Sequence, residues 1–138
     1  MKPIRTWLAM ALAGVVLTTT AATAQQAAKE DTAFAGPDKG PATVDVSRYP
    51  AEQQANYRVF AGKCARCHTL ARPINSAYVL PDEWERYIKR MMRKPGSGIS
   101  SADGKRIFEF LKYDSQTRKK ELYEKKLKEQ AAGEKEGS

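Results

Sequence analysis

Apolar side chains recur at the spacing of one helix face in three segments of the middle of the chain. In the first segment Tyr57, Phe60 and Ala61 lie at positions i, i+3 and i+4, which is the period of an amphipathic helix. Pro50 precedes them, and proline suits the first helical turn, where its missing N–H would have no partner in any case. We therefore predict a first helix that begins near Pro50 and runs to Cys64.

A second amphipathic segment starts at Pro81-Asp82 and ends at Pro95-Gly96-Ser97-Gly98, a run that terminates helices. Its apolar side comprises Trp84, Tyr87, Ile88, Met91 and Met92. The preceding segment from Thr69 to Leu80 contains Pro73 and Asn75-Ser76, which oppose regular structure. We expect this segment to be a connecting loop.

A third helix is predicted to begin after Ser100 or Ser101. Either hydroxyl can cap a helix by accepting a hydrogen bond from one of its first free N–H groups. We expect Ile107, Phe108 and Leu111 to form the buried stripe of this helix. The three segments together predict an all-α fold.

The last part of the chain, residues 114–138, is densely charged. Its only apolar bulk is Leu122, Tyr123 and Leu127. Favourable i, i+4 pairs such as Glu121 with Lys125 predict a helical extension that frays after about Gln130. Such a charged run is either a solvated surface or a docking segment.

The first residues have the features of a secretory signal peptide. Lys2 and Arg5 give a positive start, an apolar run follows, and Ala22-Thr23-Ala24 matches the small-x-small cleavage pattern. The apolar run from Trp7 to Leu17 is shorter than the about 20 residues of a membrane-spanning helix. We therefore favour cleavage over an uncleaved anchor, and expect a periplasmic protein with no stable membrane span after processing.

The chain thus divides into four parts: a signal peptide (1–24), a flexible leader (25–48), a helical domain (49–113) and the charged extension (114–138). The leader is rich in Ala, Gly, Pro and Thr, a composition that buries little apolar surface. After residue 24 there are 22 basic and 16 acidic residues, a net charge of about +6. Anionic lipid, nucleic acid and acidic proteins all suit that charge.

The chemical centre of the sequence is Cys64-Ala65-Arg66-Cys67-His68, a Cys-x-x-Cys-His motif. This is the attachment motif of c-type haem. Two thiols about one helical turn apart can add to the two vinyl groups on one edge of a porphyrin. The histidine that follows then lies beneath the iron and supplies an imidazole nitrogen. We predict one covalent haem c per chain, with His68 as an iron ligand.

Three other uses of a Cys-x-x-Cys motif fit this sequence less well. A thioredoxin-like pair needs a strand-to-helix context, which is absent around residues 61–71. A structural zinc site needs about four ligands, whereas Cys64, Cys67 and His68 are all the Cys and His in the chain. A plain disulfide would leave the adjacent histidine unexplained.

The sixth iron ligand is predicted to be a methionine, since the chain has no second histidine. Met1 and Met10 would leave with the signal peptide, so Met91 or Met92 remains. We favour Met91, because it follows Trp84 and Ile88 at i, i+4, i+7 on one stripe that could face the porphyrin. Met92 remains the alternative, and both residues could instead be core methionines.

The motifs follow one another in a characteristic order. This order is Cys64-x-x-Cys67-His68, a loop, Trp84 to Met91, Pro95-Gly96-Ser97-Gly98-Ile99-Ser100 and Ile107-Phe108-Glu109-Phe110-Leu111. It resembles that of small single-haem class I cytochromes c. The resemblance implies a cytochrome c fold of about three main helices around one covalent haem, with His68 and Met91 as axial ligands. It also implies that Phe60 meets Phe108 or Leu111 where the first and last helices cross.

The resemblance covers about Tyr49 to Tyr113. Mitochondrial-type members have a longer loop after the histidine, in which a proline carbonyl orients the imidazole, and Pro73 would take that part here. The charged tail after Asp114 lies outside the family pattern.

An iron with both axial positions filled exchanges single electrons, so the expected function is one-electron transfer rather than catalysis. The only histidine is committed to iron, which removes the usual general base. Basic residues flank both ligand segments: Lys63, Arg66, Arg72, Lys89, Arg90, Arg93 and Lys94. They would steer a redox partner with an acidic surface, or only solubilise the chain; nucleic acid does not fit an exported haem protein.

Two rival functions remain. The chain could be the haem subunit of a larger dehydrogenase or reductase complex, docked through the extension after residue 113. It could also be a gas- or peroxide-responsive sensor, if the methionine bond is labile.

Overall fold

The computed structural model describes residues 40–136, and every regular element in this range is an α-helix. The helices are α2 (Ala51–Cys64), α3 (Ala71–Ile74), α4 (Pro81–Met92), α5 (Ser101–Thr117) and α6 (Lys120–Glu136). This architecture agrees with the predicted all-α class. The predicted signal peptide and most of the leader lie outside the described residues. No described helix is both long and apolar enough to cross a bilayer.

The three predicted helix starts are confirmed, and each has a local cause. Pro50 immediately precedes α2, and Pro81 is the first residue of α4. At the start of α4, Oε2 of Glu83 accepts hydrogen bonds of 2.9 Å from the backbone N–H groups of Val79 and Leu80. At the start of α5, the Ser100 hydroxyl accepts from an N–H in the first turn. These contacts satisfy polar groups that a helix end leaves without intrahelical partners.

The segment between α2 and α4 differs from the predicted loop. Residues Ala71–Ile74 form the one-turn helix α3, in which Pro73 is tolerated because a first turn has no N–H bond to lose. The segment is also largely buried, with Pro73, Ile74 and Val79 at most 2% exposed. It therefore fills the space beneath the longer helices.

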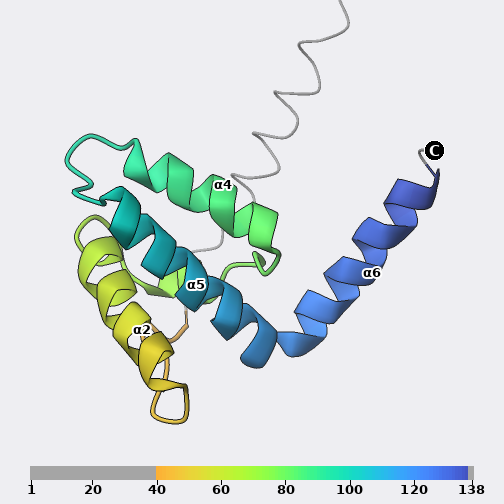
Figure 1. Cartoon of the computed structure of the whole chain (residues 1–138), viewed down its shortest axis with the longest axis horizontal. Helices are drawn as coiled ribbons and strands as arrows, with labels where there is room; N and C mark the ends of the chain where they lie inside the picture. The colour runs from red at the N-terminus through yellow and green to blue at the C-terminus, as the bar shows by residue number, and fades with distance from the viewer. Residues whose placement is uncertain (1–39, 137–138) are drawn as a thin grey trace, which may run out of the picture.

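The core lies where α2 and α4 both pack against α5 (Figure 1). The rings of Phe60 in α2 and Phe110 in α5 have centroids 5.1 Å apart, and Tyr57 lies at the same distance from Phe110. The predicted stripe of α5 is correct for Ile107 and Leu111 but wrong for the aromatic residue. Phe110 is fully buried, whereas Phe108 is only partly buried.

The buried stripe of α5 continues beyond residue 113, where the domain was predicted to end. Ser115 is fully buried and its hydroxyl accepts a 2.9 Å hydrogen bond from the Trp84 indole of α4. Asp114 is buried too, and accepts from the Tyr49 hydroxyl at 2.9 Å and from the Arg118 guanidinium. The start of the predicted extension is therefore part of the packed body.

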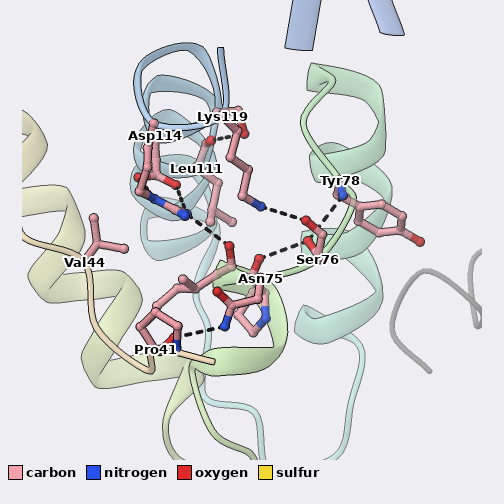
Figure 2. A network of polar contacts seen from close by, with 12 residues as sticks. Pro41, Val44, Asn75, Ser76, Tyr78, Leu111, Asp114 and Lys119 are labelled. Atoms are coloured by element: carbon pink, nitrogen blue, oxygen red, sulfur yellow. Dashed lines mark hydrogen bonds and ion pairs between the residues drawn. The ribbon is translucent and has the colours of Figure 1, made fainter. Parts of the chain in front are cut away.

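Residues 41–48, at the end of the predicted leader, also contact the helices. Val44 is 8% exposed and its N–H donates to the Tyr57 hydroxyl at 3.3 Å. The Asn75 side chain donates to the Pro41 carbonyl at 3.0 Å (Figure 2). Packing thus begins earlier along the chain than residue 49.

The C-terminal helix α6 leaves the end of α5 and projects away from α2 (Figure 1). The ion pair between Lys126 and Glu83 connects it to α4. Along α6, Lys120 pairs with Glu124 and Lys125 with Glu129 at i, i+4 spacing. Leu127 is 40% exposed, the one large hydrophobic side chain so exposed in the described range. The predicted charged helical extension is confirmed as a helix, but it continues to Glu136, whereas it was predicted to fray after about Gln130.

Lys119, between α5 and α6, is a partly buried cation. Its ammonium donates to the Ser76 carbonyl at 2.8 Å (Figure 2) and lies over the Trp84 ring. Burial lowers the Lys119 pKa to about 8, and the Arg118 charge adds to that effect. The nearby carboxylates of Asp114 and Glu83 oppose it only in part.

We expect stability to rise with pH because of Lys119. Its folded pKa of about 8 lies below the ordinary value of 10.5, so the unfolded chain binds more protons between these values. The free energy of unfolding should therefore increase from pH 8 to pH 10.5 relative to Lys119→Met, by about 3 kcal/mol at most. Urea unfolding of both proteins at pH 7.5 and pH 10 measures the difference. If the difference in the free energy of unfolding between the two proteins is the same at both pH values, the prediction is contradicted.

Candidate haem site

The Cys-x-x-Cys-His motif begins in the last turn of α2. Asn56, Phe60 and Cys64 are the buried residues of this helix and lie at i, i+4 and i+8, so Cys64 continues the core stripe. Cys64 is 7% exposed, whereas Cys67, beyond the helix end, is exposed. No disulfide joins the two sulfurs. One thiol is therefore anchored in the core and the other is accessible.

Burial raises the pKa of the Cys64 thiol to about 12, and the neighbouring Cys67 contributes in the same direction. Cysteines that work in thiol–disulfide exchange need a depressed pKa and a positive environment. Burial moves the pKa of Cys64 in the opposite direction, although basic residues line the same cavity. The geometry thus gives no support to a thioredoxin-like use of the motif.

The His68 ring is half-buried, with Nδ1 3.0 Å from the carbonyl oxygen of Thr69. A carbonyl oxygen can only accept, so Nδ1 carries the proton in the neutral ring and Nε2 keeps its lone pair. Metal-ligating histidines commonly show this arrangement. The Pro73 carbonyl, which was predicted to orient the imidazole, is not the partner of Nδ1 here, since Nδ1 contacts the Thr69 carbonyl.

A cavity of about 380 Å³ opens beside the motif. It is lined by Lys63, Cys64, Cys67, His68, Arg72, Tyr87, Arg90, Met91, Lys94, Ser97 and Ile99. These residues come from α2, the motif, α3, α4 and the loop before α5. The cavity therefore brings together the two thiols, the imidazole and one thioether from segments far apart in the sequence.

The two methionines of α4, Met91 and Met92, lie on different sides of the helix. Met91 lines this cavity. Met92 lies in a second, shallower groove between α4 and α5, where a methyl group placed on Gly104 would come within 2.8 Å of its sulfur. The 100° turn between consecutive helical residues separates the two sulfurs in this way.

The predicted stripe of Trp84, Ile88 and Met91 does not face the cavity as a unit. Trp84 and Ile88 are 1% and 5% exposed and are absent from the cavity wall. The face of α4 that lines it is formed by Tyr87, Arg90 and Met91, and Lys94 lines it from just beyond the end of this helix. Met91 does line the cavity, but the stripe of Trp84 and Ile88 from which it was predicted belongs to the core.

Four of the seven predicted basic residues line the cavity. They are Lys63, Arg72, Arg90 and Lys94. The guanidinium of Arg90 also lies 5.9 Å from the centroid of the Tyr87 ring. Arg66, Lys89 and Arg93 are exposed and outside the wall. The rim of the cavity is therefore cationic. This charge would suit a bound molecule that carries carboxylates at its edge.

Sequence reasoning missed the contribution of the loop between α4 and α5. Ser97 and Ile99 line the cavity, although the Pro-Gly-Ser-Gly run indicated only the end of a helix. The sequence signal for this contribution was Ile99, an isolated apolar residue in a polar loop. In the structure the two glycines before it, Gly96 and Gly98, have positive φ.

Comparison with known proteins found no matching family model, no matching curated protein and no matching solved structure. The case for the site rests on its own chemistry. Within residues 40–136, no group of three or more Cys, His, Asp and Glu side chains is arranged to hold a metal ion. The donor set at the cavity is instead two thiols, one imidazole and one thioether, which fits a covalently attached haem with its iron between nitrogen and sulfur.

Proposed function

We propose that this chain carries one covalently attached haem c and acts as an exported one-electron carrier. The observation that carries the proposal is the convergence of Cys64, Cys67, His68 and Met91 on one cavity. Haem bound there would supply an iron that exchanges single electrons. The resemblance to small class I cytochromes c supports the same reading.

Each cavity residue has a separate task in this proposal. Cys64 and Cys67 would anchor the haem covalently, and Nε2 of His68, freed by the Thr69 contact, would bind the iron. Met91 would occupy the opposite position and raise the reduction potential. With both axial positions taken, no site is left for a substrate, which favours a carrier over an enzyme or a gas sensor.

The cationic rim gives the proposed carrier a preference among partners. Arg72, Arg90 and Lys94 belong to the cavity wall, and the chain after residue 24 has 22 basic and 16 acidic residues, a net charge of about +6. Such a surface raises the association rate with an acidic redox protein, an effect that weakens with salt. The partner proposed is therefore a protein with an acidic docking surface.

The decisive experiment compares Met91→Ala with Met92→Ala in the exported, haem-loaded protein. The oxidised wild-type protein should show the weak far-red band of a methionine-to-iron bond. This band should disappear in Met91→Ala and persist in Met92→Ala, because only Met91 lines the cavity. The reduction potential should fall markedly in Met91→Ala alone.

Three results would contradict the proposal in different ways. Absence of haem staining on the denatured chain would exclude covalent attachment. Loss of the band only in Met92→Ala would show that Met92, and not Met91, is the sixth ligand. Rapid carbon monoxide binding by the reduced wild-type protein would favour the sensor over the carrier.

A haem subunit of a larger redox complex is the second candidate, and α6 is the observation that favours it. This helix projects from the body with few contacts and an exposed Leu127 (Figure 1). Deletion of residues 121–138 leaves Lys119 and the α5 core in place. If α6 docks the complex, this deletion should abolish co-purification with the complex while the haem spectrum is unchanged. Unchanged co-purification would exclude the docking role.

A further inference from the structure

The loop of residues 93–100 joins the end of α4 to the start of α5 and forms one wall of the candidate haem cavity. It begins directly after the two methionines. Hydrogen bonds from Lys94 N–H to the Met91 carbonyl and from the Ser97 hydroxyl to the Met92 carbonyl, both 3.1 Å, tie its first half to α4. Its position therefore affects the end of α4 on which Met91 lies.

The second half of this loop is attached to α2 through Lys63, the residue before Cys64. The Lys63 ammonium donates to the Gly98 carbonyl at 2.9 Å and forms an ion pair of 2.9 Å with Oδ2 of Asp103. The same carboxylate accepts from the N–H of Ser100 at 3.0 Å and from its hydroxyl at 2.7 Å. One lysine thus joins the haem-attachment helix to both the loop and the start of α5.

Arg66, inside the Cys-x-x-Cys motif, makes a second contact with the loop. Its guanidinium lies 3.5 Å from the Ser97 carbonyl. A Cβ atom on Gly98 would come within 2.5 Å of this guanidinium, and Gly98 has a φ of 60°. The left-handed backbone favours glycine at this position, and a side chain there would also displace the Arg66 guanidinium. The close approach of Arg66 is therefore built into the loop sequence.

We infer that Lys63 is a positioning residue that clamps the 93–100 loop onto α2 and so keeps Met91 on the iron. This inference rests on the proposed function, and it assigns Lys63 a role other than partner steering. The Lys63 side chain is 33% exposed and its charge is already paired with Asp103. Charge-assisted hydrogen bonds are the stronger class in proteins, so their loss should let the loop open more often.

The test measures how fast imidazole displaces methionine from the oxidised, haem-loaded full-length protein. Disappearance of the far-red band after rapid mixing reports the rate. Lys63→Met removes both contacts, and should accelerate displacement about tenfold, which corresponds to about 1.4 kcal/mol. Lys63→Arg keeps the charge and should restore most of the slow rate. Asp103→Asn tests the same clamp from α5 and should also accelerate displacement.

A readout on the loop itself accompanies the spectroscopy. Deuterium uptake by the backbone amides of residues 96–99 should increase in Lys63→Met, because the opening of the loop exposes them. The matched control is Lys89→Met, which breaks an exposed ion pair of 2.7 Å with Glu85 and lies outside the cavity wall. It should change neither the displacement rate nor the uptake by these amides.

The outcomes separate this inference from the proposed function. Absence of covalent haem or of the far-red band in the wild-type protein overturns both. If haem and band are present and neither Lys63→Met nor Asp103→Asn accelerates displacement, the clamp is excluded and the carrier function stands. Equal acceleration in Lys89→Met would also exclude it, since a general loss of surface charge would then explain the effect.

Discussion

Replacing Cys64 and Cys67 together with alanine should abolish covalent haem attachment. The two thiols are the only cysteines of the chain and both line the candidate cavity, so no other side chain can form the thioether bonds. Haem staining after denaturing electrophoresis measures the result, with the exported protein quantified by antibody. The expected change is complete loss of stain at unchanged electrophoretic position.

The matched control for this experiment lies between the two cysteines. Ala65→Ser changes an exposed residue of the same motif that does not line the cavity, and it should retain full staining. Staining of the double alanine variant at the wild-type level would mean that the haem is not held through these sulfurs, and would remove the basis of the proposed function.

Phe110→Ala should cause the largest loss of stability among single substitutions in the helix crossing. Phe110 is fully buried, and the centroid of its ring lies 5.1 Å from the ring centroids of both Phe60 and Tyr57. Truncation of a buried phenylalanine costs about 3–5 kcal/mol, whereas domains of this size are stable by about 5–15 kcal/mol. Denaturant unfolding followed by circular dichroism measures the free energy of unfolding.

Phe108→Ala is the control for Phe110→Ala and also decides between the two readings of α5. Phe108 is partly buried, lines the shallow groove beside Met92 and lies under the ammonium of Lys112, 5.4 Å from its ring centroid. Its truncation should cost clearly less than that of Phe110. An equal or larger cost for Phe108 would contradict the observed orientation of the helix.

The starts of the helices could be predicted because their causes are local. A proline in the first turn, as at Pro81, and the Ser100 hydroxyl act on backbone groups a few residues away. The same holds for the candidate attachment motif, in which Cys64, Cys67 and His68 are neighbours along the chain. The helix α3 was not predicted. Pro73 indicated a loop, but it stands in the first turn of α3, where proline is tolerated.

The orientation of each helix could not be predicted with the same success. In α5, Ile107, Phe108, Phe110 and Leu111 are all apolar, so the sequence allows two overlapping stripes. Only contact with α2 and α4 selects the stripe that contains Phe110. In α4 the same ambiguity concealed the face of Tyr87 and Met91 that lines the cavity.

The sequence by itself determined the helical class and the helix starts, and it predicts haem attachment at Cys64-Ala65-Arg66-Cys67-His68, since each depends on residues that are close along the chain. The tertiary structure decided which methionine shares a cavity with His68, which aromatic residue fills the crossing, and that Lys63 joins the loop before α5. These outcomes depend on the rotation of whole helices about their axes. That rotation is set by packing between distant segments, which no local pattern specifies.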